Sequence, residues 1–363
     1  MLFEPITLRS LTIPNRAWMS PMCMYSAATD GPGAGVPHDW HFSHLAARAA
    51  GGAGLIFTEA TAVSPEGRIS PADLGLWNDH QERAFARVSH LLTLHGAVPG
   101  IQLAHAGRKA STDRPWHGGK PVAPAAGGWQ PVGPSPVPFD DGYPTPHELT
   151  VEEIQQVVAA FAGAAGRALR AGFRVAEVHG AHGYLIGEFL SPHSNHRTDA
   201  YGGTFANRAR LALEVAGAVR AVWPEELPVF FRVSATDWLT ENPADERDGW
   251  TVDDTVRLAK ELHARGIDLL DTSSGGNAPR ARVVAAPGYQ VPFAARVRAE
   301  TGMPVAAVGK ITDPAQAEDI LTSGRADAVL LGRELLRDPY WPRRAARELG
   351  ARPSWPDQYG YAV

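Results

Sequence analysis

Short apolar segments alternate along this chain with longer helical segments. The apolar runs predict eight buried strands: Ala17–Met22, Leu55–Thr61, Val98–Leu103, Val175–His179, Val229–Ser234, Leu269–Ser273, Val305–Val308 and Ala328–Leu331. The longer segments predict helices: Phe42–Ala50, Gln81–His95, Val151–Ala171, Ala206–Val222, Val252–Arg265, Pro292–Thr301, Pro314–Ser323 and Glu334–Leu349. Continuous apolar strands are typical of a parallel sheet covered on both faces. The pattern therefore predicts an α/β fold, a closed (β/α)8 barrel of the TIM type.

Local signals support two of the helix starts. Thr150 and Glu153 have the spacing of a capping box, and Asp313 before Pro314 is typical of an N-cap followed by proline in the first turn. Three further segments lie outside the minimal barrel, and we expect one domain over residues 1–363. Residues 2–13 predict a hairpin that closes the barrel bottom. Residues 104–149 predict a loop insertion after strand three that serves as a lid or as a binding element, and residues 350–363 predict a C-terminal tail.

Composition excludes several classes of protein. Apolar residues make up 44% of the chain and charged residues 20%, which argues against disorder. The net charge of -5 gives no basic field for nucleic acid, and no apolar run reaches the length of a membrane span. The start lacks the features of a signal peptide, and Cys23 is the single cysteine, so we expect a cytoplasmic protein without disulfides.

The most informative candidates for chemistry follow the fourth strand. His179, His182 and Tyr184 lie where a strand gives way to a loop, which is where barrel enzymes place working residues. Two histidines can donate to a carbonyl oxygen that gains negative charge, and a tyrosine with an ordinary pKa of about 10 can deliver a proton. A zinc pair or core histidines are the alternatives. No third ligand has a recognisable metal spacing nearby, so we expect no metal site.

Other strand ends add to this constellation. Gly309 and Gly332 follow strands seven and eight, where many barrels bind phosphate, and Arg333 could add a forked contact. Arg232 stands on an apolar strand, either facing an electron-rich ligand or pairing with an acid such as Glu59. Cys23 ends the first strand, either as a cofactor contact or as an inert buried thiol.

These residues lie in motifs that resemble the old yellow enzyme family of FMN-dependent ene-reductases, in its thermophilic-like, cysteine-containing branch. The similarity runs from Phe3 to about Tyr359. The matching motifs are N-R with S-P-M-C-M-Y (Asn15–Tyr25), Q-L-A-H-A-G-R-K (Gln102–Lys109), H-G-A-H-G-Y-L (His179–Leu185), S-N-H-R-T-D-A-Y-G-G (Ser194–Gly203), F-R-V-S-A (Phe231–Ala235) and G-R-E-L-L-R-D-P (Gly332–Pro339).

The resemblance implies a non-covalent FMN at the barrel mouth. It implies that Ser20, Pro21, Met22, Cys23 and Ala60 line the flavin ring and that Gln102 binds its pyrimidine edge. Arg232 would face the part of the ring that becomes negative on reduction. Gly309, Gly332 and Arg333 would hold the phosphate. His179 and His182, with Tyr25, would bind the substrate, and Tyr184 would be the proton donor.

The implied reaction is ping-pong hydride transfer from NADPH, with NADH as an alternative, to an α,β-unsaturated carbonyl or nitro compound. We expect a homo-oligomer, dimer or tetramer, that binds no nucleic acid and no membrane. One departure concerns the tail, where Tyr361 replaces an arginine that in part of the branch reaches a neighbouring subunit's site. A barrel lyase or aldolase and a flavin-storage or sensor protein are the alternative functions.

Overall fold

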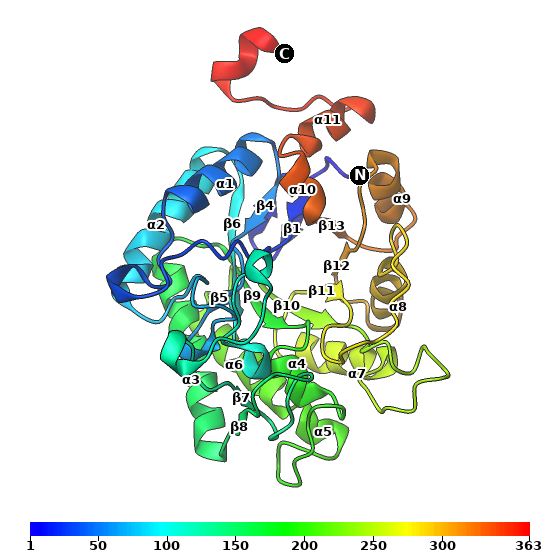
Figure 1. The fold of residues 1–363 in the computed structure, drawn as a ribbon. Helices are drawn as coiled ribbons and strands as arrows, with labels where there is room; N and C mark the ends of the chain where they lie inside the picture. The colour runs from blue at the N-terminus through cyan, green and yellow to red at the C-terminus, as the bar shows by residue number, and fades with distance from the viewer.

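Eight parallel strands close into a barrel in the computed structural model, which describes residues 1–363 (Figure 1). Around the barrel run β3 (Ala17–Met19), β4 (Leu55–Phe57), β6 (Val98–Ala104), β9 (Val175–Gly180), β10 (Val229–Ser234), β11 (Leu269–Ser273), β12 (Val305–Val308) and β13 (Ala328–Leu331). The pairing of β13 with β3, and of β4 with β6, closes the circle. The predicted (β/α)8 barrel is confirmed.

Helices surround the strands, as Figure 1 shows. They are α1 (Asp39–Ala50), α2 (Asp79–Leu94), α3 (Val151–Arg170), α4 (Leu185–Leu190), α5 (Phe205–Arg208), α6 (Arg210–Val222), α7 (Val252–His263), α8 (Val291–Thr301), α9 (Pro314–Thr322), α10 (Arg333–Arg337) and α11 (Trp341–Glu348). Both predicted caps form, since Thr150 accepts from the Glu153 N–H and Asp313 from the Gln316 N–H. No helix has the length and apolar composition that a membrane crossing needs.

Three predicted elements are divided and one helix was not predicted. The helix expected over 334–349 is interrupted because Asp338 precedes Pro339 and takes an extended backbone with φ -129°. The break between α5 and α6 is slight, since Ala209 keeps helical angles. The strand expected over 55–61 continues only as the short β5 (Thr61–Ala62). The six-residue α4 lies in a loop whose sequence is too short to reveal a helical period.

The predicted hairpin is present at the amino end of the barrel. β1 (Ile6–Leu8) pairs antiparallel with β2 (Leu11–Ile13). Arg9 at the turn forms an ion pair of 2.6 Å with Asp268, which directly precedes β11. Because parallel strands begin at the same face, this contact places the hairpin at the barrel bottom, opposite the strand ends that carry the candidate chemistry.

The barrel interior is layered. An aromatic layer of Trp18, Phe57 and Phe230 packs with ring centroids about 6 Å apart. Two residues further along β10, Arg232 points into the barrel beside Asp271 of β11, its partner in the register. Charged side chains therefore begin at the level where the apolar filling ends, on the carboxyl side of the barrel.

The 104–149 segment folds back over the first strand end. It contains the short paired strands β7 (Val132–Gly133) and β8 (His147–Glu148). Arg114 Nε donates to the Tyr25 carbonyl at 3.0 Å, and the Trp116 ring meets the Tyr25 ring edge-on at 6.1 Å. At the other end of the chain, the tail beyond α11 extends away from the barrel, and Tyr361 is 94% exposed (Figure 1).

Replacing Thr150 with Ala is expected to lower the free energy of unfolding by about 1 kcal/mol. The hydroxyl satisfies one backbone N–H at the start of α3, and the reciprocal contact of Glu153 satisfies another at 2.7 Å. Chemical denaturation measures the change. Thr7→Ala, an exposed threonine in the hairpin, serves as control, and an equal loss in both variants would remove the special role of the cap.

Candidate active site

A cavity of about 740 Å³ opens at the carboxyl ends of the strands. Most predicted site residues line it: Ser20, Pro21, Met22, Cys23, His182, Arg232, Gly309, Gly332 and Arg333. Tyr25, Ala60, Gln102, His179 and Tyr184 do not line this cavity but pack beside it or beneath it. A volume of this size is typical of a site for a small molecule or cofactor.

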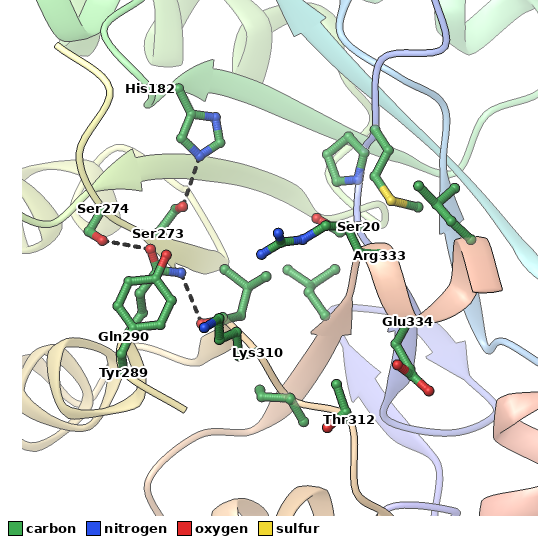
Figure 2. A pocket seen from close by; sticks show the side chains of 18 of the residues that line it. Ser20, His182, Ser273, Ser274, Tyr289, Gln290, Lys310, Thr312, Arg333 and Glu334 are labelled. Carbon is green, nitrogen blue, oxygen red and sulfur yellow. Dashed lines mark hydrogen bonds between the residues drawn. The ribbon is translucent and has the colours of Figure 1, made fainter. Parts of the chain in front are cut away.

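One end of the cavity offers anion-binding groups (Figure 2). The backbone N–H groups of Gly309, Lys310 and Gly332 donate no hydrogen bond within the chain. Gly309 has φ +121°, and a Cβ there would lie 2.9 Å from Gln290 Nε2. The side chains of Lys310 and Arg333 line the same end. Free backbone donors beside two cations form a fitting cradle for a phosphate group.

His182 lines the other end of the cavity, and His179 and Tyr184 pack against His182 beside it. The ring centroid of His179 lies 5.1 Å from that of His182 and 5.3 Å from that of Tyr184. A hydrogen bond from the His182 N–H to Ser234 Oγ, 2.9 Å long, holds this turn. The backbone of His182 is left-handed, with a φ of 60°. Such strain in a residue other than glycine is frequent at functional sites. The predicted constellation of His179, His182 and Tyr184 is thus brought together by one turn.

Hydrogen bonds within the chain define which ring nitrogen of each imidazole is free to donate a hydrogen bond to a ligand. His179 Nδ1 accepts from the Ala181 N–H at 3.4 Å, which favours the tautomer with hydrogen on Nε2. His182 Nε2 lies 2.8 Å from Ser273 Oγ (Figure 2). A ligand that takes a hydrogen bond from His182 Nε2 therefore competes with Ser273.

Burial and two cations keep both imidazoles neutral. Burial chiefly, with the positive charges of Arg232 and Lys109, holds the pKa of His179 and His182 well below its ordinary value. Burial likewise raises the pKa of the Tyr184 phenol, with smaller contributions from Cys23 and Asp73. At neutral pH the site therefore presents imidazoles that donate without charge and a phenol that holds its proton.

Lys109 connects the turns around this triad. Its Nζ donates to the His182 carbonyl at 2.9 Å and to the Gly276 carbonyl at 2.8 Å, and lies 5.0 Å from the Tyr184 ring centroid. Burial lowers the pKa of Lys109 to about 8, so the amine is still mainly charged at neutral pH. One ammonium group thereby joins the loop after β9 to the loop after β11.

Replacing Lys109 with Met is expected to accelerate amide hydrogen exchange about tenfold at residues 180–184 and 275–278. The variant keeps the side-chain length but loses two hydrogen bonds, each worth about 1 kcal/mol. Exchange followed by mass spectrometry measures the change. Lys120→Met makes the same chemical change at an exposed position of the 104–149 segment. Unchanged exchange in both variants would show that the loops hold without Lys109.

Cys23 and Tyr25 belong to a small packed cluster beside the cavity. Together with Tyr184 they pack on a buried apolar group that contains Ala60 and Ala104. Burial chiefly, with the nearby Asp73 and Glu59, raises the pKa of the Cys23 thiol, which therefore stays protonated. A neutral thiol at the cavity wall is compatible with a contact to a bound group and is unsuited to nucleophilic attack.

The partner of Arg232 differs from the one considered in the sequence. Arg232 Nε pairs with Asp271 Oδ2 at 2.9 Å, not with Glu59. Glu59 instead accepts the Met24 N–H at 2.7 Å and lies 3.4 Å from His41 Nε2. Glu59 therefore fixes the backbone that follows the first strand, while Arg232 remains available at the cavity floor.

Some residues at the cavity were not singled out as site residues. Ser273 is the last residue of β11 and Lys310 follows β12, and this place at the carboxyl ends of strands was the signal in the sequence that could have found them. Tyr289 and Gln290 come from the loop before α8, and no pattern marked them. Gln290 accepts from Ser274 Oγ at 2.6 Å and donates to the Val308 carbonyl at 3.0 Å, so it joins the two strand ends (Figure 2). No group of three or more His, Cys, Asp or Glu side chains has an arrangement that could hold a metal ion.

Comparisons with known proteins agree with this geometry. Residues 1–351 match the NADH:flavin oxidoreductase / NADH oxidase family. An NADPH dehydrogenase of Geobacillus thermodenitrificans is 49% identical over 359 residues, which are 99% of this chain and 97% of that protein. Among solved structures, morphinone reductase in complex with tetrahydroNAD is 32% identical with a TM-score of 0.77, covering 98% of this chain and 92% of that one. The old yellow enzyme homologue from Zymomonas mobilis is 28% identical with a TM-score of 0.78, covering 98% and 97%.

Proposed function

The chain belongs to the NADH:flavin oxidoreductase / NADH oxidase family, and from this premise we propose that it reduces the activated C=C bond of α,β-unsaturated carbonyl or nitro compounds. It is an oxidoreductase that uses FMN, with a reduced nicotinamide as electron donor. The observation that carries the proposal is one cavity with free backbone donors and cations at one end and neutral His donors near the other.

The residues present fit FMN. The N–H groups of Gly309, Lys310 and Gly332, with the Arg333 side chain, would hold the phosphate. The chain between Ser20 and Cys23 would line one edge of the ring, and Arg232 at the cavity floor would face the part that gains negative charge. Bound FMN supplies hydride transfer, taking two electrons from the nicotinamide and passing them to the alkene.

The chain's own residues activate the substrate. Neutral His179 and His182 can donate hydrogen bonds to the carbonyl or nitro oxygen, which withdraws electron density from the β-carbon. Because both imidazoles are uncharged, they stabilise the developing oxyanion without giving up a proton to it. Tyr184 packs beside His179 and is protonated at neutral pH, and it would protonate the α-carbon. Tyr25 would line the same pocket.

The nicotinamide and the alkene are proposed to use this pocket in turn, which gives ping-pong kinetics with NADPH as donor and NADH as an alternative. No dinucleotide fingerprint appears in the sequence that would provide a second site. We further propose that the protein is a cytoplasmic homo-oligomer that acts on small-molecule alkenes. Residues 104–149 would form a lid over the site.

The purified protein is expected to be yellow and to release FMN, not FAD, on heat denaturation. One cradle for a phosphate and no adenylate-binding motif are the reason. Chromatography of the released flavin identifies it, and anaerobic NADPH should bleach the bound flavin until an enone restores the colour. A colourless protein would favour the lyase or aldolase alternative, and a flavin that does not bleach would favour storage or sensing.

A further inference from the structure

Two acidic side chains lie inside the barrel at the level of the cavity floor. Glu177 of β9 and Asp271 of β11 are both 0% exposed. The strand between them carries Arg232, which is the register partner of Asp271 and of His179. None of the chemistry proposed above uses Glu177 or Asp271, although burying a carboxyl group without a role is costly.

Each acid contacts one residue that is proposed to meet the flavin. Asp271 Oδ2 lies 2.9 Å from Arg232 Nε. Glu177 Oε1 accepts a hydrogen bond from Gln102 Nε2 at 2.8 Å. Glu177 Oε2 and both carboxylate oxygens of Asp271 have no hydrogen-bond partner, so Asp271 and Arg232 form an ion pair without a hydrogen bond. The two acids therefore fix the orientation of the guanidinium and of the amide from below.

Glu177, Asp271 and Arg232 form a charged layer inside the barrel. The charges of this layer balance only if the two carboxyl groups together keep one proton. Two ionised carboxylates against a single guanidinium would leave one negative charge unpaired in a dry interior. No other cation faces the pair, since β6 contributes Gln102, β12 places Ala306 beside Asp271, and His179 on β9 is neutral. Asp271 is in contact with the guanidinium, so the proton belongs mainly to Glu177. Burial, with the nearby Asp271 charge, raises the pKa of Glu177 to about 8, and burial raises that of Asp271 to about 6.

We propose that Glu177 and Asp271 are positioning residues for the flavin, which hold Gln102 and Arg232 in place and share one proton that keeps the layer neutral. The proposal rests on the proposed function for the identity of the bound group. Because either acid can carry the single negative charge, the loss of one is compensated by ionisation of the other. The loss of both leaves Arg232 uncompensated beneath the flavin.

A double-mutant cycle tests this with Glu177→Gln, Asp271→Asn and the double variant. The measured quantity is the affinity of reduced relative to oxidised FMN, obtained from the midpoint potential. Each single variant should change this ratio by less than about threefold. The double variant should favour reduced FMN by about ten- to a hundredfold, because a positive charge at a few Å then acts without a counter-ion. Each tenfold corresponds to about 30 mV for a two-electron couple.

Other patterns would overturn the proposal. A large increase in either single variant would show that both carboxylates are ionised. If the affinity ratio changes in the double variant only by the sum of two small single-variant changes, the two acids do not set the charge beneath the flavin. A wild-type protein that binds no flavin would instead defeat the proposed function, and the infrared measurement below tests the shared proton without flavin.

A measurement without flavin covers the case in which the double variant does not fold. Infrared difference spectra between the wild type and each single variant at pH 7 isolate the C=O stretch of the shared carboxylic acid from that of other buried acids, such as Glu188, whose pKa burial raises to about 8. The band of one carboxylic acid should be lost in Glu177→Gln, where the remaining Asp271 stays ionised against Arg232, and in Asp271→Asn, where Glu177 ionises to pair with Arg232. A difference spectrum that shows no such loss in either variant would refute the shared proton.

Discussion

Replacing Tyr184 with Phe is expected to slow reduction of an enone by about 10²–10⁴-fold while reduction of the flavin by NADPH continues. The phenyl ring preserves the packing against His179 and the contact with Lys109. The lost hydroxyl is the proposed proton donor, and burial keeps the Tyr184 phenol protonated. Stopped-flow measurement of flavin reoxidation by an enone, after anaerobic reduction, reports the affected step.

Two comparisons make this result specific. Reoxidation by a nitroalkene should be affected least, because a nitronate is stable enough to leave the site and take its proton from water. Tyr340→Phe removes another phenol, one that packs on Trp355 and Tyr359 of the C-terminal tail, and should leave both rates near those of the wild type. If Tyr184→Phe reduces the enone at an undiminished rate, the proton comes from water or from another residue.

Replacing either His179 or His182 with Ala is expected to cost about 3–4 kcal/mol of transition-state stabilisation in the reduction of an enone. Each variant removes one of the two neutral hydrogen-bond donors proposed for the oxygen that gains charge. The same variants should bind a phenol more weakly, because a phenolate presents a similar oxygen. Rates of flavin reoxidation and phenol titrations of the flavin spectrum measure the two effects.

The controls for the histidine variants follow from the contacts. His90→Ala changes an exposed histidine on α2 and should have no effect. Ser273→Ala removes the partner of His182 Nε2 and should tighten phenol binding if that donor is used. Because the pKa of both imidazoles lies well below its ordinary value, enone binding should show no imidazole titration between pH 6 and 8. Wild-type rates in both Ala variants would remove the pair from the mechanism.

Much of this molecule is encoded locally in the sequence. A strand buried on both faces is mostly apolar, so the runs that form β9 to β13 are visible directly despite single charged residues such as Glu177, Arg232 and Asp271. The carboxyl ends of parallel strands meet at one face of a barrel, so residues far apart in the chain, such as Cys23, His182 and Gly332, could be assigned to one site before any contact was known. Helix starts such as Thr150 were equally predictable, because capping involves neighbours three residues apart.

Only the tertiary structure decided the contacts between strands. The register of β10 and β11 sets Asp271 beside Arg232, and the Glu59 considered from the sequence contacts Met24 and His41 instead. Lys109 was visible as the last residue of the Gln102–Lys109 motif, but its position over Tyr184 depends on three loops packing together. The sequence by itself thus determined the elements and the face on which the chemistry gathers, because burial periodicity and strand direction are local properties. Which charge meets which partner depends on register and loop packing, and these arise only when distant segments close into one barrel.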